Sequence, residues 1–329
     1  MINKSKKLFG DMATCEMKAI RDGFGAGLVE AGWLDNRVVA LSADLRESVK
    51  MSEFIKQFPE RYIEAGVAEQ NMAVVASGLA SYGKIPFIAS FAVFNPGRNW
   101  EQIRTTVCLN DMPVKIIGSH AGVGVGEDGG SHQALEDIAL MRVLPNMTVI
   151  VPADAEEARK ATLAIAKTLK PAYLRVARQK SALFTTSESP FEIGKAEVLW
   201  STDKPDAVII ACGTLVFESI MAAERLASEG VFVTVINNHT IKPLDSETLI
   251  SEITMAGAVV TAEDHQVAGG LGGAVAELVA EYCPVPVEFV GVRNRFGQSG
   301  EAGVLAEEYG LTRESIITAV KKVIARKKK

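Results

Sequence analysis

The first half of the chain alternates short apolar runs with longer amphipathic stretches. Runs rich in β-branched and other apolar residues predict strands at 38–41, 85–89, 114–118, 148–151 and 172–175. Between them, apolar residues recur at helical spacing over 69–81 and 155–169. Strands that alternate with helices of this length are typical of βαβ units and a mostly parallel sheet.

This rhythm breaks over residues 181–194, where Thr, Ser, Glu and Pro are frequent, and we interpret that segment as a linker. The alternation then resumes with strands at 207–211, 231–236 and 258–262, a helix over 216–228 and a glycine-opened helix from Gly269. We therefore predict an α/β protein of two domains, each a mostly parallel sheet flanked by helices. The first domain covers 1–180, and the second covers 195–329.

Composition narrows the class of protein. Of 329 residues, 48% are hydrophobic and 23% are charged, which provides for two cores and excludes a disordered chain. The net charge of -5 argues against a nucleic-acid partner. No apolar run is long enough to cross a membrane, and the N-terminus lacks the apolar core of a signal peptide. The four cysteines form no CxxC pair. We expect a soluble, cytoplasmic protein without a membrane partner.

The most informative segment is the loop over residues 119–133. It follows a predicted strand, and ligands bind at the carboxyl ends of strands in open α/β sheets. Five of the nine residues from 122 to 130 are glycines, which let a backbone approach a ligand. His120 and His132 bracket the loop, with Glu127 and Asp128 between them. This pattern predicts a ligand-binding loop.

Two other interpretations of this loop are weaker. Residues 124–129 match the Gly-x-Gly-x-x-Gly dinucleotide pattern, but Glu127 and Asp128 would place negative charge where a pyrophosphate rests. A metal site of His120, Asp128 and His132 fits no standard ligand spacing. We therefore expect no metal ligands in this chain.

Three further features admit a structural and a functional interpretation. Glu69 opens an otherwise apolar helix, where it either interacts with the helix dipole or shares a proton with a bound group. Phe91 and Phe94 either fill the core or stack on a flat heteroaromatic ring. His265 and the glycine-rich helix start that follows it have the character of an anion site, which we interpret as mostly structural.

Taken in order, these segments resemble the transketolase family. Gly-Val-Ala-Glu-Gln at 66–70, Ser-Phe-Ala-Val-Phe at 90–94 and the whole loop at 119–133 are similar to that family's pyrimidine-binding domain. The similarity continues through 144–147 and 151–154, and the second half resembles the family's C-terminal domain. The resemblance implies thiamine diphosphate as the cofactor.

One motif of thiamine-diphosphate enzymes does not occur in the sequence. Those enzymes hold Mg²⁺ or Ca²⁺ and the diphosphate with a Gly-Asp-Gly that is followed later by Asn, and this chain contains no Gly-Asp-Gly. The resemblance therefore implies the smaller, C-terminal-type subunit of a split transketolase. Its partner, an N-terminal-type subunit, would carry the metal and diphosphate motif. Self-association across a dimer interface would give two large and two small subunits.

The resemblance also implies roles for single residues. Glu69 would contact the pyrimidine N1′ of the cofactor and shift its proton equilibrium. Phe91 and Phe94 would stack around the pyrimidine, and Asp44 would lie beside the cofactor.

Other residues would contact the sugar phosphate. His120, Asp128 and His132 would meet the sugar hydroxyls, with His132 favoured for proton transfer and His120 also in the catalytic set. Arg178 would bind the phosphate, and Ser48 is a weaker candidate for that task.

The sequence departs from the family pattern at one position. A second phosphate-binding arginine often follows Ala-Thr in full-length transketolases, whereas here Ala13-Thr14 precedes Cys15. Either Arg21 or a partner residue would then replace it, or the sugar phosphate would be bound less tightly.

The implied reaction transfers a two-carbon ketol unit from a ketose phosphate to an aldose phosphate, for example from xylulose 5-phosphate to ribose 5-phosphate in the pentose phosphate pathway. Two related alternatives are the β subunit of a 2-oxo-acid dehydrogenase E1 component and a deoxyxylulose-phosphate-synthase-like chain. A non-catalytic partner that keeps only a dimer surface is the alternative from another class.

Overall fold

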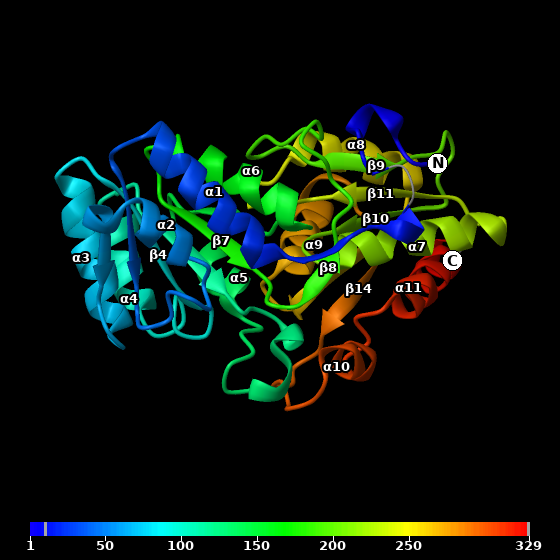
Figure 1. The fold of residues 1–329 in the computed structure, drawn as a ribbon. Coiled ribbons are helices and arrows are strands. Elements are labelled where there is room, and N and C mark those ends of the chain that lie inside the picture. The colour runs from blue at the N-terminus through cyan, green and yellow to red at the C-terminus, as the bar shows by residue number, and fades with distance from the viewer. Residues whose placement is uncertain (10–11, 328–329) are drawn as a thin grey trace.

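Two large sheets lie side by side along the molecule, each with helices around it (Figure 1). The computed structural model describes residues 1–9 and 12–327. Within these ranges the strands form a seven-stranded sheet, a five-stranded sheet and a two-stranded pair. The predicted α/β class, with two domains built on mostly parallel, helix-flanked sheets, is confirmed.

The seven-stranded sheet has the order β12-β6-β7-β5-β4-β2-β3. Strands β2 to β7 run parallel to their neighbours, and only β12 at the edge is antiparallel. The central strands are buried along their whole length, as expected for a sheet covered on both faces. The strands are β2 (Val38–Ser42), β3 (Tyr62–Glu64), β4 (Ile85–Phe91), β5 (Lys115–Ser119), β6 (Thr148–Ile150), β7 (Ala172–Val176) and β12 (Thr240–Lys242).

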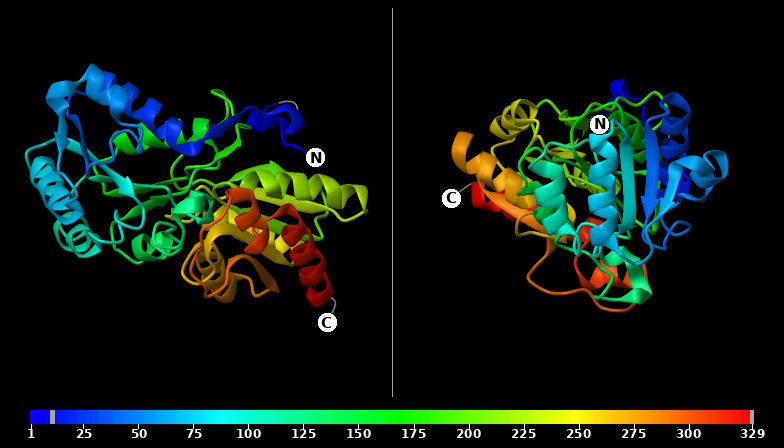
Figure 2. Two further views of the ribbon diagram at one scale, coloured as in Figure 1. Left: turned by 60° about the horizontal axis from the view of Figure 1, so that its bottom comes forward. Right: turned by 90° about the vertical axis from the view of Figure 1, so that its left-hand side faces the viewer.

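Helices cover both faces of this sheet (Figure 2). One face carries α1 (Ile20–Leu34), α2 (Ser52–Gln57) and α6 (Ala155–Ala166). The other carries α3 (Glu69–Ser81), α4 (Trp100–Gln102), the π-helix η4 (Ile103–Cys108) and α5 (Asp137–Arg142). Helix α6 ends three residues before the predicted boundary of 169, because its last turn tightens as Thr168 bonds back to Ile165.

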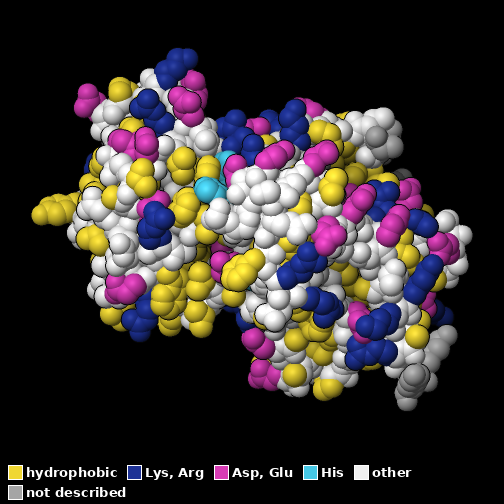
Figure 3. All heavy atoms as spheres, turned by 90° about the horizontal axis from the view of Figure 1, so that it is seen from below, with side chains coloured by type: hydrophobic (Ala, Val, Ile, Leu, Met, Phe, Trp, Pro, Cys, Tyr) yellow, Lys and Arg dark blue, Asp and Glu magenta, His cyan; other side chains and the backbone are white. Residues whose placement is uncertain are grey.

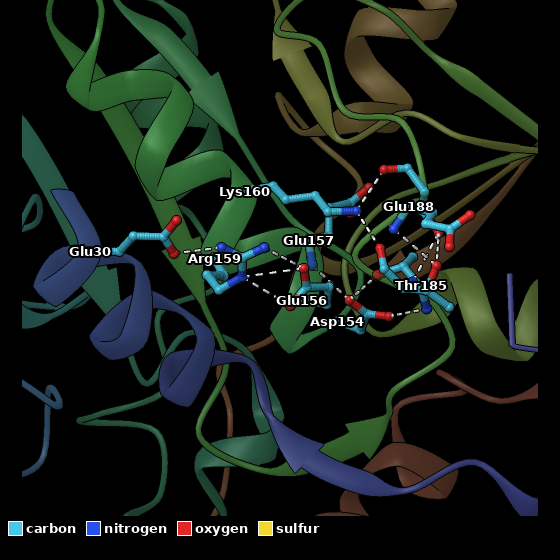
Figure 4. Close-up of polar contacts among 10 residues, drawn as sticks. Glu30, Asp154, Glu156, Glu157, Arg159, Lys160, Thr185 and Glu188 are labelled. Carbon is cyan, nitrogen blue, oxygen red and sulfur yellow. Dashed lines mark hydrogen bonds and ion pairs between the residues drawn. The ribbon is translucent and has the colours of Figure 1, made fainter. Parts of the chain in front are cut away.

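Close packing of α1 on α6 depends on glycine. A Cβ atom on Gly23 would lie 1.7 Å from the carbonyl oxygen of Ala155, so only glycine allows this approach. Arg159 of α6 adds an ion pair with Glu30 of α1, at 2.5 Å (Figure 4).

The five-stranded sheet has the order β14-β13-β10-β11-β9. Its strands are β9 (Glu197–Trp200), β10 (Ala207–Ala211), β11 (Val233–Asn237), β13 (Val259–Gln266) and β14 (Val287–Val292), and only β9 is antiparallel. The helices packed around it are α7 (Leu215–Ser228), α8 (Ser246–Ala256), α9 (Leu271–Tyr282) and α11 (Arg313–Lys327), with the short α10 (Ala302–Glu308) before α11.

The two halves of the chain are interlocked. Strand β12 comes from the second half but pairs with β6 of the first sheet. In the opposite sense, the amino terminus packs on the second half, where Asn3 N–H donates to the Leu199 carbonyl. One buried apolar cluster contains residues of both halves, including Met72 of α3 and Ile210 of β10. The domains therefore share a core and hold each other in a fixed arrangement.

Residues 181–194, predicted as a linker, are tied to the first sheet. The segment starts within β8 (Lys180–Ala182), which pairs with β1 (Met17–Ala19). Figure 4 shows the contacts that follow. Asp154 at the start of α6 accepts from the backbone N–H and hydroxyl of Thr185, at 2.6 and 2.7 Å. The ammonium of Lys160 donates to the Ser189 carbonyl at 2.6 Å. Short 3₁₀ turns complete the fold: η1 (Lys4–Lys6), η2 (Met12–Thr14), η3 (Pro59–Arg61) and η5 (Val123–Asp128).

Candidate functional site

The predicted site residues follow successive parallel strands at one edge of the first sheet. The register pairs Ser42 with Ala89, and Phe91 with Ser119. Ser119 in turn pairs with Val176. Because these strands are parallel, the residues just beyond β2, β4, β5 and β7 lie at the same edge, which is where open α/β sheets bind ligands.

Four of the predicted residues form one aromatic cluster. The ring centroid of Phe91 lies 3.9 Å from that of His120 and 6.4 Å from that of Phe94, and the two phenylalanine rings are inclined by only 20°. The ring of His132 meets both phenylalanines edge-on, with centroids 6.1 and 5.5 Å away. Two segments 30 residues apart therefore create a flat, apolar surface with imidazoles at its border.

His120 is held in a defined neutral state. Its Nε2 lies 3.0 Å from Nη1 of Arg21, which has only hydrogens to offer, so Nε2 is the acceptor. Its Nδ1 then carries the proton and donates to the Ser119 hydroxyl at 2.8 Å. Burial, reinforced by the charges of Arg21 and Arg178, lowers the pKa of His120 to about 3. His120 is therefore neutral at physiological pH and carries no proton to release as an acid, and both of its ring nitrogens are engaged within the chain.

Glu69 is the first residue of α3 and is only 2% exposed. Its Oε2 accepts from Nη1 of Arg98 at 2.9 Å. Its Oε1 accepts no hydrogen bond from any residue that the structure describes. A buried carboxylate with one oxygen in use is poised to accept a proton or a hydrogen bond from a bound group.

Arg98 was not predicted as a site residue. Its guanidinium lies 4.6 Å from the centroid of Phe94 while it pairs with Glu69, so it joins the carboxylate to the aromatic cluster. The sequence signal is the spacing of four residues from Phe94 to Arg98, and the backbone N–H of Arg98 does donate to the Phe94 carbonyl. An aromatic–arginine pair at this spacing points to the same face of a helical turn.

The glycine loop places Asp128 beside Arg178. Gly122, Gly126 and Gly129 all have positive φ, between 75° and 86°, which fold residues 122–129 back on themselves. The guanidinium of Arg178 lies 3.9 Å from the Asp128 carboxylate, and Asp128 is exposed. Arg178 also lies 3.8 Å from Glu127. The predicted phosphate-binding residue and the predicted hydroxyl-binding residue are therefore neighbours.

Arg21, and not the residue after Ala13-Thr14, occupies the site. Besides its contact with His120, it donates to the backbone carbonyl of Ser48 at 2.9 Å. Cys15 instead packs at the margin of the second domain's apolar core. Ser48 enters the site through its carbonyl.

Asp44 lies at the same sheet edge, two residues beyond the end of β2. It is exposed, has a φ of 58°, and its N–H donates to the Glu64 carboxylate at 2.8 Å. The same carboxylate accepts from the Gly66 N–H, so Glu64 orders the turns that follow β2 and β3. Glu64 was not predicted to have this role, since nothing in its local sequence marks it.

Figure 3 shows histidine atoms at the surface on the underside of the molecule, with hydrophobic and charged side chains around them. His132 is the partly exposed histidine; His120, His239 and His265 are buried. In the part of the chain that the structure describes, no group of three His, Cys, Asp or Glu residues could hold a metal ion. Likewise, none of the described helices is long and apolar enough to cross a membrane.

Comparisons with known proteins identify the family of both domains. Residues 16–182 match the family model of the transketolase pyrimidine binding domain, and residues 194–316 match that of the transketolase C-terminal domain. A putative transketolase C-terminal section from Methanocaldococcus jannaschii is 44% identical over 91% of this chain and 94% of its own length. A 6-deoxy-6-sulfo-D-fructose transketolase subunit, SqwH, from Clostridium sp. (strain MSTE9) is 41% identical over 94% of this chain and 95% of its own.

A solved structure of a split gene transketolase, described as an inactive beta4 tetramer, superposes with a TM-score of 0.87. It is 44% identical in sequence, and the match covers 94% of this chain and 99% of that one. The two family models together span both sheets, and the relatives match over nearly their whole length. The chain therefore belongs to the transketolase family, and its relatives of similar length are split transketolase subunits.

Proposed function

We propose that this chain is the smaller subunit of a two-chain transketolase that transfers a two-carbon ketol unit from a ketose phosphate to an aldose phosphate. The observation that carries the proposal is the convergence of buried Glu69, the Phe91–Phe94 surface and both loop histidines at one sheet edge. In this proposal residues 1–180 provide the cofactor-facing domain, 181–194 the connection, and 195–329 the second domain.

The residues present fit the pyrimidine end of thiamine diphosphate. The uncommitted Oε1 of Glu69 matches a ring nitrogen that carries a proton, and the phenylalanine rings offer a flat apolar face to a heteroaromatic ring. Exposed Asp44 would lie beside the cofactor from the end of β2. When bound, thiamine diphosphate supplies the electron sink for breaking and forming the carbon–carbon bond.

The loop residues would act on the sugar. Neutral His120 would accept from a sugar hydroxyl at Nε2 in place of Arg21, while its Nδ1–H keeps the bond to Ser119. His132, at the edge of both phenylalanine rings, would transfer the proton next to the reacting carbonyl. Asp128 would bind a neighbouring hydroxyl.

The anionic end of the substrate would bind between Arg178 and Arg21, with Ser48 beside them. Both guanidinium groups can bind two oxygens of a phosphate, and the same geometry suits a sulfonate. Because one relative is named as a 6-deoxy-6-sulfo-D-fructose transketolase subunit, that sulfonated ketose is the second donor to test.

The diphosphate and its Mg²⁺ or Ca²⁺ would be held by a partner chain of the N-terminal transketolase type. Two observations support this: the similar-length relatives are named as a subunit and a C-terminal section, and the related tetramer is described as inactive. Two copies of each chain in a symmetric heterotetramer would complete two sites.

The test is reconstitution. This chain alone should neither bind thiamine diphosphate tightly nor transfer ketol units, whereas its mixture with the partner and Mg²⁺ should do both. Assays with xylulose 5-phosphate and ribose 5-phosphate measure the proposed reaction. Decarboxylation of a 2-oxo acid, or formation of deoxyxylulose phosphate, would favour one of the two related enzymes instead. Tight cofactor binding and turnover by the isolated chain would contradict the proposal.

A further inference from the structure

The glycine loop at 122–133 carries Asp128 and His132, and the first domain holds it through Arg178, which donates to the Val125 carbonyl, and through the rings around His132. Its three positive-φ glycines leave the backbone without a regular hydrogen-bond ladder. The loop closes with bonds of its own, such as the His132 N–H to the Gly129 carbonyl at 2.9 Å. An open loop of this kind samples many conformations unless other groups fix it.

The side chain of Gln133 supplies such a fixation. Its Nε2 lies 3.2 Å from the carbonyl oxygens of both Val123 and Gly126, and 3.0 Å from the carbonyl oxygen of Gln298. Three acceptors around one atom identify it as the amide nitrogen and not the oxygen. Gln133 is only 3% exposed, so these bonds form away from water.

The third acceptor belongs to the second domain, in the turn between β14 and α10. This turn lies against the loop at several points. A Cβ on Gly297 would lie 1.7 Å from Oε1 of Gln133, and one on Gly129 would lie 2.4 Å from the Ser299 hydroxyl. Beside it, the Asp264 carboxylate accepts from the Val123 N–H at 3.1 Å. The second domain therefore reaches the loop from outside the sheet that carries the site.

From these contacts we infer that Gln133 is a positioning residue: its amide, held by the 297–299 turn of the second domain, fixes the loop that presents Asp128 and His132 to the substrate. The catalytic part of this inference rests on the proposed ketol transfer. The structural part does not, because it concerns the order of the loop in this chain.

We call the contact between the Gln133 amide and the 297–299 turn the clamp. Two variants break it, one from each side. Gln133→Ala removes the amide. Gly297→Ala leaves the amide in place, but its new methyl group would overlap the end of the Gln133 side chain, which moves more easily than backbone. Matched controls are Gln298→Ala, since Gln298 contributes its backbone carbonyl and its side chain is exposed, and Gly303→Ala, where an added Cβ meets nothing within 4 Å.

The first readout is amide hydrogen exchange in this chain. Loss of a buried hydrogen-bonding group removes about 1–3 kcal/mol, so exchange over 122–133 should quicken by about five- to a hundredfold in Gln133→Ala and Gly297→Ala. Exchange in α3 and in both control variants should not change. Unaltered exchange in the loop, or an equal increase in α3, would overturn the clamp whether or not the enzyme transfers ketol units.

The second readout uses the complex with its partner. In the two clamp variants the KM for the donor sugar should rise about tenfold or more, while thiamine-diphosphate affinity stays within about twofold, because Glu69 and Phe91 lie on other elements. A loss of cofactor affinity in step with activity would assign Gln133 a general structural role instead. If the wild-type complex shows no ketol transfer, the proposed function fails, and the exchange experiment still decides the role of the clamp.

Discussion

The two sheets of this chain present the same kind of edge and use it differently. At the carboxyl edge of the first sheet, Glu69 keeps one carboxylate oxygen uncommitted and Asp128 is exposed. At the corresponding edge of the second sheet, Glu263 accepts from the backbone N–H groups of Leu271 and Gly272 at 2.7 Å, which caps α9. One edge retains hydrogen-bonding capacity for a ligand, and the other is filled by its own side chains.

This difference corrects a simple interpretation of glycine-rich helix starts. The start of α9 has the character of an anion site, since its backbone N–H groups and helix dipole would favour negative charge. The anion there is the chain's own carboxylate, whose pKa burial raises to about 7. Such a helix start is available to a ligand only when no internal acid satisfies it.

The largest effect is expected at the carboxyl edge of the first sheet, which we call the open edge because Glu69 keeps a carboxylate oxygen uncommitted there. Glu69→Gln keeps the shape of the side chain but removes its charge and its basicity. General acid–base contributions of this type are about 100- to 10,000-fold, so we expect a loss of that size in kcat of the reconstituted complex. Size-exclusion chromatography should show normal assembly, and Glu60→Gln, at an exposed acid outside the site, provides a control. Activity near that of the wild type would remove Glu69 from the mechanism.

The next effect breaks a buried contact between the two domains, made by Arg175 of β7. Arg175, 6% exposed, pairs with Asp137 at 2.9 Å and donates to the Asp264 carbonyl of the second domain at 2.7 Å. Removing one member of a buried ion pair costs about 3–5 kcal/mol, so Arg175→Ala should lower the free energy of unfolding by about that amount. Chemical denaturation measures it. Arg178→Ala, at the open edge, should leave stability within about 1 kcal/mol, and equal losses in the two variants would mean that the burial of Arg175 does not set its contribution.

The sequence predicted what depends on local pattern. The helix over 69–81 and the strand over 207–211 have the predicted bounds, because apolar periodicity and burial agree there. Phe91, Phe94, His120 and His132 converge because each follows a parallel strand or lies in the loop after one.

What the sequence did not predict depends on distant segments. Strand β12 crosses to the first sheet, and Arg175, Gln133 and Arg98 obtain their roles from partners between 29 and 165 residues away. A residue of this kind carries no local signal, because its role depends on which elements the fold brings together.

A smaller effect is expected when Arg178 at the open edge is changed, and this variant separates substrate binding from chemistry. Arg178→Lys keeps the charge but loses the two-pronged guanidinium, so we expect the KM for sugar phosphates to rise about 10- to 100-fold with a smaller change in kcat. An unphosphorylated ketose donor should show no such rise. A similar KM increase for both donors would mean that Arg178 does not bind the phosphate group.

The last prediction concerns the buried interior, and its effect is spread over a range of pH so that it is small for each pH unit. Glu157 is buried between the two domains, where it accepts from the Ala153 N–H and from Asn237, and burial together with Asp154 raises its pKa to about 8. In the unfolded chain this carboxyl group titrates near its ordinary value of about 4.3. Between these values the folded protein holds a proton that the unfolded chain has released. The free energy of unfolding should therefore fall as pH rises from about 5 to about 8, by at most about 1.4 kcal/mol per pH unit, and level off above that range.

Glu157→Gln removes this titrating group, so its midpoint of thermal unfolding should depend less on pH over the same range than that of the wild type. Glu156→Gln is the matched control, because the neighbouring Glu156 is only partly buried and pairs with Arg159 at the surface of α6. Glu263 titrates in the same direction in all three proteins, so the difference between their curves isolates Glu157. Parallel curves for the wild type and Glu157→Gln would show that this carboxylate is already charged in the folded chain. Burial alone would then not distinguish Glu157 from the carboxylates of the open edge.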